Sequence, residues 1–441
     1  MEQEIYRIYL KQHIGKSALA CVSCGDQVKT GEIIGRANEG LSLNVHASVS
    51  GTISQVTEEY VEIRSLLGEK EEYMRLTETD PLALVQEAGL CGMGGAGFPT
   101  YIKLGTNLRQ GGMVIVNATE CEPILGHNIQ RIIANPKEVI EGLRIAMEIT
   151  KATKGVIAIK EKNTEAVSIL KKHLEAGKNL SSDNAIDLSL DIAILPDLYP
   201  MGEERAVIRE ITGKLLDIES LPSAANAVVI NLETVYRIYE AVRLKKPVIT
   251  KDITVGGSVY NGTVIYMDVP IGTQVSFLLD KTGGIKEDVG ELIMGGPFTG
   301  KRITSEEYVS KTTGGIIAAM PFLKDKRNMG LLVCACGANE ERLRQIAVSM
   351  GANVVSVEFC KQAHMVKGTL KCDNPGKCPG QSQKVLQLRK NGAQSLLISN
   401  CTDCTNTVMS IAPQLAMPVY HCTDGALRAA GKKLVRKIHL E

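Results

Sequence analysis

Apolar runs of strand length alternate with helical stretches across residues 71–245, and this alternation restricts the fold more than any other feature of the sequence. In chain order, the runs and the stretches between them are MVIVNAT, PKEVIEGLRIAMEIT, GVIAIK, NTEAVSILKKHLEAG, IAILPD, ERAVIREITG and AVVINLETV. Repeats of strand and helix predict a mainly parallel α/β sheet of Rossmann-like type. Because ligands of such sheets bind beyond the carboxyl ends of the strands, we expect a site in the loops that follow these runs.

The flanking segments have different patterns. Residues 1–70 hold short alternating runs around turn glycines and predict a barrel-sandwich hybrid similar to biotinyl and lipoyl carrier domains, but without the lysine that such carriers modify. Residues 246–328 combine short strands, glycines and one short helix, which predicts a small α+β module. Residues 329–441 repeat strand then helix and hold most of the cysteines. We therefore expect a multidomain α/β protein with four units.

Composition excludes several classes of protein. Fifty basic and forty-nine acidic residues give a net charge of +1 without a polybasic block, so no nucleic-acid partner is expected. No apolar run approaches the roughly 20 residues that span a bilayer, and no signal-peptide pattern is evident. Twelve cysteines are too few for a disulfide scaffold of this length. We expect a cytoplasmic protein whose partners are small molecules and other proteins, with a homo-oligomer left open.

The loop GLCGMGGAGFPTYIKL, residues 89–104, is the strongest motif. Its glycines leave the backbone N–H groups open to a phosphate or an aromatic ring, and Lys103 supplies a cation for an anion. A tight turn without a ligand would use glycine as well, so the loop alone leaves both readings open.

The wider pattern resembles a family. The loop is similar to the flavin-binding G-x-G-G-A-G-F-P-T-x-x-K of the NADH-binding flavoprotein subunit of complex I, and the chain resembles the related RnfC protein of the Rnf electron-transport complex more closely. The resemblance continues in VNATECEP at 116–123, YPMGEERAVIREITG at 199–213 and INLETVYRIYEA at 230–241. It covers roughly residues 10–325. It implies an NADH-dependent oxidoreductase that contains FMN, with a β-grasp module of SLBB type at 246–328.

The resemblance also implies roles for single residues. Around FMN it places Gly92, Gly94, Gly95, Ala96, Gly97, Phe98 and Lys103, with Asn231 and Thr234 near the flavin phosphate. At the flavin or the nicotinamide ribose it places Asn117, Glu120 and Glu122, and in the NADH pocket Tyr199, Gly202, Glu203 and Glu204. Carboxylates bind ribose hydroxyls and disfavour a 2′-phosphate, so NADH is expected over NADPH. Without the motif, Glu203 and Glu204 would read as two solvated acids at a helix start.

Cysteine gathers in the last unit. None occurs between Glu122 and Val333, and eight lie between Cys334 and Cys422. In a parallel sheet, the residues that follow strands meet at one edge, which predicts convergence of Cys334, Cys336, Cys360, Cys401 and Cys422. Both related families continue into a C-x-x-C-x-x-C run that binds a four-iron cluster. This chain instead has C-A-C at 334–336, C-x5-C at 372–378 and C-T-D-C at 401–404.

These cysteines have three open interpretations. The first is a dithiol relay in which Cys401 and Cys404, at the start of a helix whose dipole lowers a thiol pKa, act with Cys334 and Cys336. The second is an iron–sulfur cluster or another metal, with ligands drawn from Cys334, Cys336, Cys360, Cys372, Cys378, Cys401 and Cys404. The third is a purely structural role.

The segments LLVCACGANEERLR, KCDNPGKCPGQ and NCTDCTNTVM, added to this body, resemble the family of proline reductase-associated electron-transfer proteins of amino-acid-fermenting anaerobes. That resemblance implies transfer of electrons from NADH through FMN and the C-terminal cysteines to D-proline reductase subunits. Two alternatives remain. One is an Rnf-type subunit of a membrane-associated complex with an iron–sulfur or other metal site. The other is a non-catalytic scaffold without flavin, against which the intact glycine loop argues.

Overall fold

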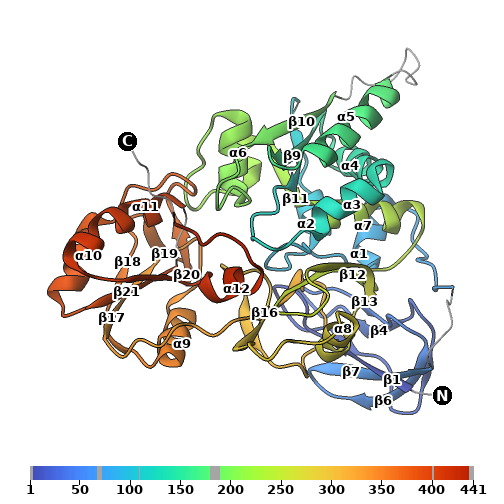
Figure 1. Cartoon of the computed structure of the whole chain (residues 1–441). Coiled ribbons are helices and arrows are strands. Elements are labelled where there is room, and N and C mark those ends of the chain that lie inside the picture. The colour runs from blue at the N-terminus through green and yellow to red at the C-terminus, as the bar shows by residue number, and fades with distance from the viewer. Residues whose placement is uncertain (1–2, 67–71, 109, 179–188, 400–401, 437–441) are drawn as a thin grey trace.

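A computed structural model describes the chain except for residues 1–2, 67–71, 109, 179–188, 400–401 and 437–441 (Figure 1). Its sheets follow one another along the chain, from the blue N-terminal strands to the orange and red C-terminal unit on the left of Figure 1. In the described part of the chain, no helix has the length and apolar character needed to cross a membrane.

The N-terminal unit consists of two antiparallel sheets, as the turn-glycine pattern predicts. One sheet has the order β1 (Gln3–Tyr9), β7 (Tyr60–Leu66), β6 (Gly51–Val56) and β3 (Gln27–Val28). The other has the order β2 (Leu19–Ala20), β4 (Ile33–Arg36) and β5 (Val45–His46). Ile8, Ile34, Ile53 and Ile63 are buried in a hydrophobic core that continues into the next unit, so the two units share one apolar interior.

The second unit is the predicted parallel sheet. Its strand order is β10 (Ser189–Leu195), β9 (Lys154–Lys160), β8 (Met113–Ala118) and β11 (Ala227–Asn231), and all neighbouring pairs are parallel. The helices are α1 (Pro81–Glu87), α2 (Thr100–Leu104), α3 (His127–Ala134), α4 (Pro136–Thr150), α5 (Thr164–Lys178), α6 (Glu204–Thr212) and α7 (Leu232–Arg243), with a 3-10 turn, η1 (Pro222–Ala225). Leu143 and Val235 pack on one face of the sheet, and Val207 and Ile208 of α6 on the other. Helix α6 therefore lies on the face opposite α4 and α7.

The third unit is a mixed sheet with one helix. Its order is β13 (Val264–Pro270), β12 (Thr250–Gly257), β16 (Gly315–Ala319), β14 (Glu291–Met294) and β15 (Lys301–Ile303), and α8 (Val275–Lys281) packs against it. Strand β12 pairs parallel with β16, whereas the other pairs are antiparallel. This arrangement agrees with the expected small α+β module.

The C-terminal unit is a second parallel sheet, with the order β18 (Asn353–Phe359), β17 (Asn328–Val333), β21 (Ser395–Ile398) and β22 (Val419–His421). Its helical segments are α9 (Glu340–Met350), α10 (Ser382–Lys390), α11 (Thr402–Ile411), η2 (Pro413–Leu415) and α12 (Asp424–Ala429). The stretch GALRAAGKKLVRK was expected to be one helix, but α12 ends at Ala429 because Gly431 adopts a left-handed conformation with φ of 61°.

The C-terminal unit also contains a hairpin that the sequence pattern did not predict. Strands β19 (Ala363–Val366) and β20 (Thr369–Cys372) pair antiparallel between β18 and α10. Lys367 and Gly368 join them with φ values of 49° and 78°, as a tight two-residue turn requires. The hairpin ends at Cys372 and so brings a cysteine to the sheet edge by a route other than a parallel strand.

Candidate functional site

The glycine loop lies against the N-terminus of α7. The Met93 N–H donates to Thr234 Oγ1 at 2.9 Å, and Asn231 caps α7 by accepting from the Thr234 N–H at 3.3 Å. A Cβ at Gly94 would collide with the Asn231 side chain, so this close approach requires glycine. Within the described part of the chain, the N–H groups of Gly94, Gly95 and Ala96 donate to no acceptor. Open donors beside a helix N-terminus form an arrangement that suits a phosphate.

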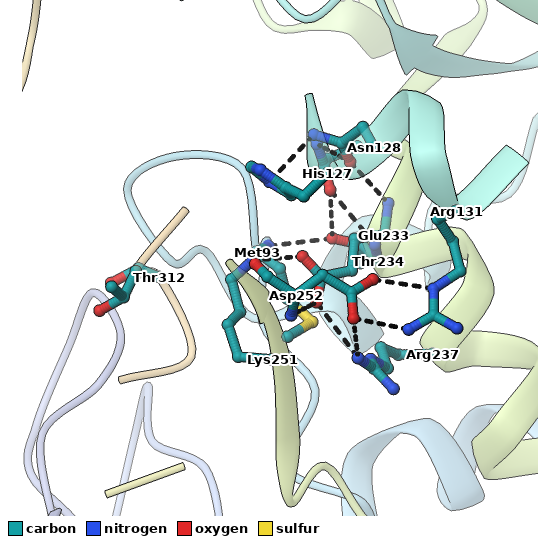
Figure 2. A network of polar contacts seen from close by, with 12 residues as sticks. Met93, His127, Asn128, Arg131, Glu233, Thr234, Arg237, Lys251, Asp252 and Thr312 are labelled. Atoms are coloured by element: carbon teal, nitrogen blue, oxygen red, sulfur yellow. Dashed lines mark hydrogen bonds and ion pairs between the residues drawn. The ribbon is translucent and has the colours of Figure 1, made fainter. Parts of the chain in front are cut away.

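A buried network of charged groups supports this loop (Figure 2). Asp252 of β12 accepts from Arg131 of α3 at 2.8 and 2.5 Å and from Arg237 of α7 at 3.2 Å. Glu233 of α7 pairs with Lys251 and accepts from the Asp252 N–H at 2.8 Å. Burial opposes ionisation of Asp252, but the guanidinium groups of Arg237 and Arg131 hold the pKa of its carboxyl below the usual range. The network thus joins α3, α7 and β12 beneath the loop.

The residues that follow β8 form hydrogen bonds within the protein. Asn117 Nδ2 donates to Gly202 O at 2.8 Å, and Glu120 accepts from the Asn128 N–H at 3.0 Å. Glu122 accepts from the N–H groups of Phe298 and Thr299 at 2.8 and 2.9 Å, and burial raises the pKa of its carboxyl. These expected ribose contacts therefore bind backbone groups, and Glu122 joins the α/β unit to the mixed sheet.

The expected NADH segment lies between the glycine loop and the C-terminal unit. Glu204 forms an ion pair with Lys103 at 2.5 Å, so the expected anion-binding cation already has a carboxylate partner. Glu203 caps α6 by accepting from the N–H groups of Arg205 and Ala206, both at 2.9 Å, and burial raises the pKa of its carboxyl. The cap is a more specific role than that of a solvated acid.

Tyr199 and Gly202 complete this segment. The Tyr199 ring stacks on Phe298 with centroids 3.7 Å apart, and its hydroxyl donates to Cys336 O at 2.5 Å. Burial raises the pKa of the Tyr199 hydroxyl well above 10. The Gly202 N–H donates to Cys121 Sγ at 2.7 Å. Tyr199 therefore links the segment to both the third and the C-terminal units.

A cleft of about 510 Å³ lies beside this segment. Glu120 and Glu122 line it from the α/β unit together with Lys162, and Leu427 and Lys432 line it from the C-terminal unit. Carboxylates and ammonium groups therefore face one space between two units.

Four cysteine thiols gather at one edge of the C-terminal sheet, where the parallel topology predicts convergence. Cys334 and Cys336 follow β17, Cys360 follows β18, and Cys372 ends the hairpin. The Cys336 sulfur is hydrogen-bonded with Cys334 and Cys372, and these bonds hold the pKa of the Cys336 thiol well below its usual range. A hydrogen bond with Cys334 lowers the pKa of Cys360 to about 7, and the hydrogen bond with Cys336 raises the pKa of Cys372.

The fifth sulfur at this edge belongs to Cys378, which is held in a disulfide. Gln381, which is fully buried, places its Nε2 3.1 Å from Cys360 Sγ and 3.9 Å from Cys378 Sγ. One amide therefore touches both a thiol of the cluster and a disulfide sulfur.

The other expected cysteines are placed differently. Cys401 lies outside the described residues, and Cys404 lies in α11 with its side chain outside the description. Cys422 follows β22 as expected but packs in the hydrophobic core, where burial raises the pKa of its thiol to about 12. Among the side chains that the structure describes, no group of three or more His, Cys, Asp or Glu residues is arranged to hold a metal ion.

Two arginines of α6 hold the cysteine hairpin against the α/β unit. Arg205 donates to Cys372 O at 2.6 Å and to Asp373 O at 2.5 Å. Arg209 donates to Asn374 Oδ1 at 2.5 Å and to Pro375 O at 2.7 Å. Sequence reasoning missed both residues. Their only signal was spacing, since residues four apart share one face of a helix.

Comparison with known proteins agrees with this architecture. Residues 1–68 match the family model of the RnfC barrel sandwich hybrid domain, and residues 85–240 match that of the Nuo51 FMN-binding domain. The RnfC-type component of the Na(+)-translocating ferredoxin:NAD(+) oxidoreductase complex of Acetobacterium woodii is 30% identical over 71% of this chain and 73% of that protein. The equivalent component of the proton-translocating ferredoxin:NAD(+) oxidoreductase complex of Clostridium ljungdahlii is 29% identical over 66% of this chain and 65% of that protein.

A third relative belongs to another system. The cobalamin reductase PduS of Citrobacter freundii is 39% identical over 53% of this chain and 48% of that protein. The match thus spans less than two thirds of the Clostridium ljungdahlii and Citrobacter freundii proteins. The identity, the coverage of the Acetobacterium woodii protein and the two matching domain models together show that this chain belongs to the RnfC-like family, with an N-terminal barrel sandwich hybrid and an FMN-binding domain of Nuo51 type.

Proposed function

We propose that this protein is an NADH-dependent electron-transfer flavoprotein that passes electrons from FMN through the cysteines of its C-terminal unit to D-proline reductase. The observation that carries the proposal is the hydrogen bond from Tyr199 to the Cys336 carbonyl, because it joins the expected NADH segment directly to the thiol cluster. Bound FMN would accept a hydride from NADH and deliver the electrons onward to thiols or one-electron acceptors.

The glycine loop fits FMN. The open N–H groups of Gly94, Gly95 and Ala96 would hold its phosphate, aided by the α7 N-terminus, while Gly92, Gly97 and Phe98 shape the same loop. A Cβ at Gly95 would meet no atom within 4 Å, so there is room beside the backbone for a ring. Thr234 fixes the loop through Met93, and Asn231 fixes it by packing against Gly94.

The cleft beside Glu120 and Glu122 fits the dinucleotide. Glu120 offers a carboxylate for ribose hydroxyls, and Lys162 and Lys432 offer cations for phosphates. Glu203 and Glu204 place negative charge near Tyr199 and Gly202, which disfavours a 2′-phosphate and therefore NADPH. Lys103, paired with Glu204, would balance that charge when NADH is bound.

An anaerobic absorption spectrum of the purified protein, supplied with FMN, tests the flavin assignment. We expect an oxidised-flavin band that NADH bleaches and NADPH does not. The Gly94→Ala variant should bind FMN roughly tenfold more weakly or worse, equivalent to about 1.4 kcal/mol, because its Cβ displaces Asn231. Gly105→Ala, at a helical position at the end of α2, is the matched control. A protein that takes up no FMN would refute the oxidoreductase proposal and leave a scaffold.

The acceptor is tested separately. With NADH as sole donor, we expect the protein to support reduction of D-proline by purified D-proline reductase, at a rate that falls when the protein is omitted. Equal rates with and without the protein would contradict this partner.

Family membership favours a second candidate, a peripheral subunit of a membrane-associated ion-translocating complex with an iron–sulfur or other metal site at the C-terminal cysteines. Iron and acid-labile sulfide in the anaerobically purified protein, together with recovery in a membrane complex, would favour that candidate over the thiol relay.

A further inference from the structure

We propose that Cys336, Cys372, Cys334 and Cys360 form a thiol–disulfide exchange relay that ends at the Cys378 disulfide. The source of the electrons rests on the proposed function, whereas the exchange among these sulfurs does not.

The sulfur contacts give the relay its order. Cys372 is hydrogen-bonded with Cys336, Cys336 with Cys334, and Cys334 with Cys360. Gln381 Nε2 then contacts the sulfurs of both Cys360 and Cys378. Thiol exchange requires a thiolate that can reach a sulfur of a disulfide, and each successive sulfur here lies next to the one before it.

Chain geometry limits which sulfurs can pair. Cys334 and Cys336 have one residue between them, so a disulfide joining them would be strained. Cys336 and Cys372 come from different segments, as do Cys334 and Cys360, and each couple is already in hydrogen-bond contact. The relay therefore consists of two couples, Cys336 with Cys372 and Cys334 with Cys360.

The two couples differ in what they face. Tyr199 and Arg205 of the α/β unit bind the carbonyls of Cys336 and Cys372, so this couple faces the proposed source of electrons. Cys360 faces Gln381 and Cys378 on the other side. Cys334 and Cys360 are each 5% exposed, which keeps external thiols away from the inner couple.

The exchange balances without another reagent. The Cys360 thiolate attacks Cys378 Sγ, the existing bond at that sulfur breaks, and the released sulfur leaves as a thiolate that takes a proton. The Cys334 thiolate then attacks Cys360 Sγ of the mixed disulfide, and Cys378 leaves as a thiol with the second proton. Cys334 and Cys360 lose two electrons in forming their bond, and the original disulfide gains two. The reduced Cys336 and Cys372 couple restores Cys334 and Cys360 by the same two displacements.

Trapping the mixed disulfide tests the relay. The full-length Cys334→Ser variant, without NADH, is equilibrated anaerobically with a fixed ratio of reduced to oxidised dithiothreitol, alkylated and mapped by mass spectrometry. We expect a Cys360–Cys378 linkage at least tenfold more abundant than in wild type, because the resolving thiol is missing. Mapping of the wild-type protein identifies the sulfur bonded to Cys378. Cys24→Ser, which alters an exposed cysteine of the N-terminal unit, is the control.

Two outcomes would overturn the relay. One is a folded Cys334→Ser variant, with wild-type circular dichroism, that lacks the Cys360–Cys378 linkage. The other is a stoichiometric metal ion that protects these four thiols from alkylation in the protein as purified. If Cys334→Ser does not fold, Gln381→Ala replaces it, and an unchanged rate of exchange between Cys360 and Cys378 in that variant would also refute the relay. The flavin spectrum reports on the proposed function separately, since bleaching by NADH without the linkage refutes only the relay.

Discussion

The glycine loop and the thiol cluster are held by different kinds of contact. Beneath the loop, ionised groups of α3, α7 and β12 pair with one another in the interior, and Arg131, Arg237 and Asp252 are at most 2% exposed. Around the cluster, Tyr199 and two arginines bind neutral backbone carbonyls, and the sulfurs bind one another. A paired network fixes one geometry, whereas sulfurs held through their backbone keep the freedom to change partners. The first suits cofactor binding and the second suits exchange.

Removing a charge from the network should have the largest effect. Asp252→Asn leaves the guanidinium groups of Arg131 and Arg237 in the interior without their shared carboxylate. We expect the free energy of unfolding to fall by about 3–5 kcal/mol, the usual cost of breaking a buried ion pair from one side. Chemical denaturation measures it, with Asp280→Asn at an exposed site of the same unit as the control. A loss similar to that of the control would show that the network does not support the fold.

Removing the arginine that holds the hairpin should have a smaller effect on stability. Arg205→Ala deletes hydrogen bonds to the carbonyls of Leu216, Cys372 and Asp373. Bonds from a charged donor contribute about 1.5–3 kcal/mol, and we expect a loss in that range. Cys372 should also be alkylated faster, because the hairpin is released from α6. Arg344→Ala, at an exposed ion pair of α9, should change neither property. Unchanged alkylation of Cys372 in Arg205→Ala would mean that α6 does not hold the cluster.

The contrast between the regions also explains what the sequence could predict. Strand ends meet at one edge of a parallel sheet whatever the side chains, so the convergence of Cys334, Cys336 and Cys360 follows from the alternation of strands and helices alone. Cys372 was not placed in this way, because β19 and β20 are four residues each. Their one clear signal, the Lys367-Gly368 turn, is too short to identify without coordinates.

Partner choice was the other limit. The motifs indicated which residues lie at the loop, but Lys103 binds Glu204, and Glu122 binds residues 298–299 of another unit. The pairing of Arg131 with Asp252 joins positions 121 residues apart, and no local pattern indicates such a pair. Spacing predicts where a side chain lies along its own element, whereas its partner depends on how the elements pack.

A conservative change at Tyr199 separates its two contacts. Tyr199→Phe removes the hydrogen bond to Cys336 O but keeps the ring that stacks on Phe298. We expect a loss of about 1 kcal/mol in the free energy of unfolding, typical of one neutral hydrogen bond. Tyr199→Ala should lose more because the stack disappears as well. Equal losses for the two variants would place the whole contribution in the hydroxyl and none in the ring.

The smallest expected effect is a pH dependence confined to the loop side. His127 of α3 is buried beside Asn128 and Thr254, and burial lowers the pKa of its imidazole to about 4. An unfolded histidine titrates near 6.5, so between pH 7 and pH 6 the unfolded chain gains a proton that the folded chain does not. Stability from this residue is therefore present above pH 6.5 and should fall by about 0.7 kcal/mol over that interval.

Chemical denaturation at the two pH values, compared between wild type and His127→Gln, isolates this contribution. The variant should lose less stability than wild type as the pH falls, by about the 0.7 kcal/mol assigned to the imidazole. Tyr199→Phe should keep the wild-type pH dependence, because the pKa of the Tyr199 hydroxyl lies well above this interval. Identical pH dependences in wild type and His127→Gln would mean that the imidazole is already solvated in the native protein. The interior beneath the loop would then be less closed than its network of charges requires.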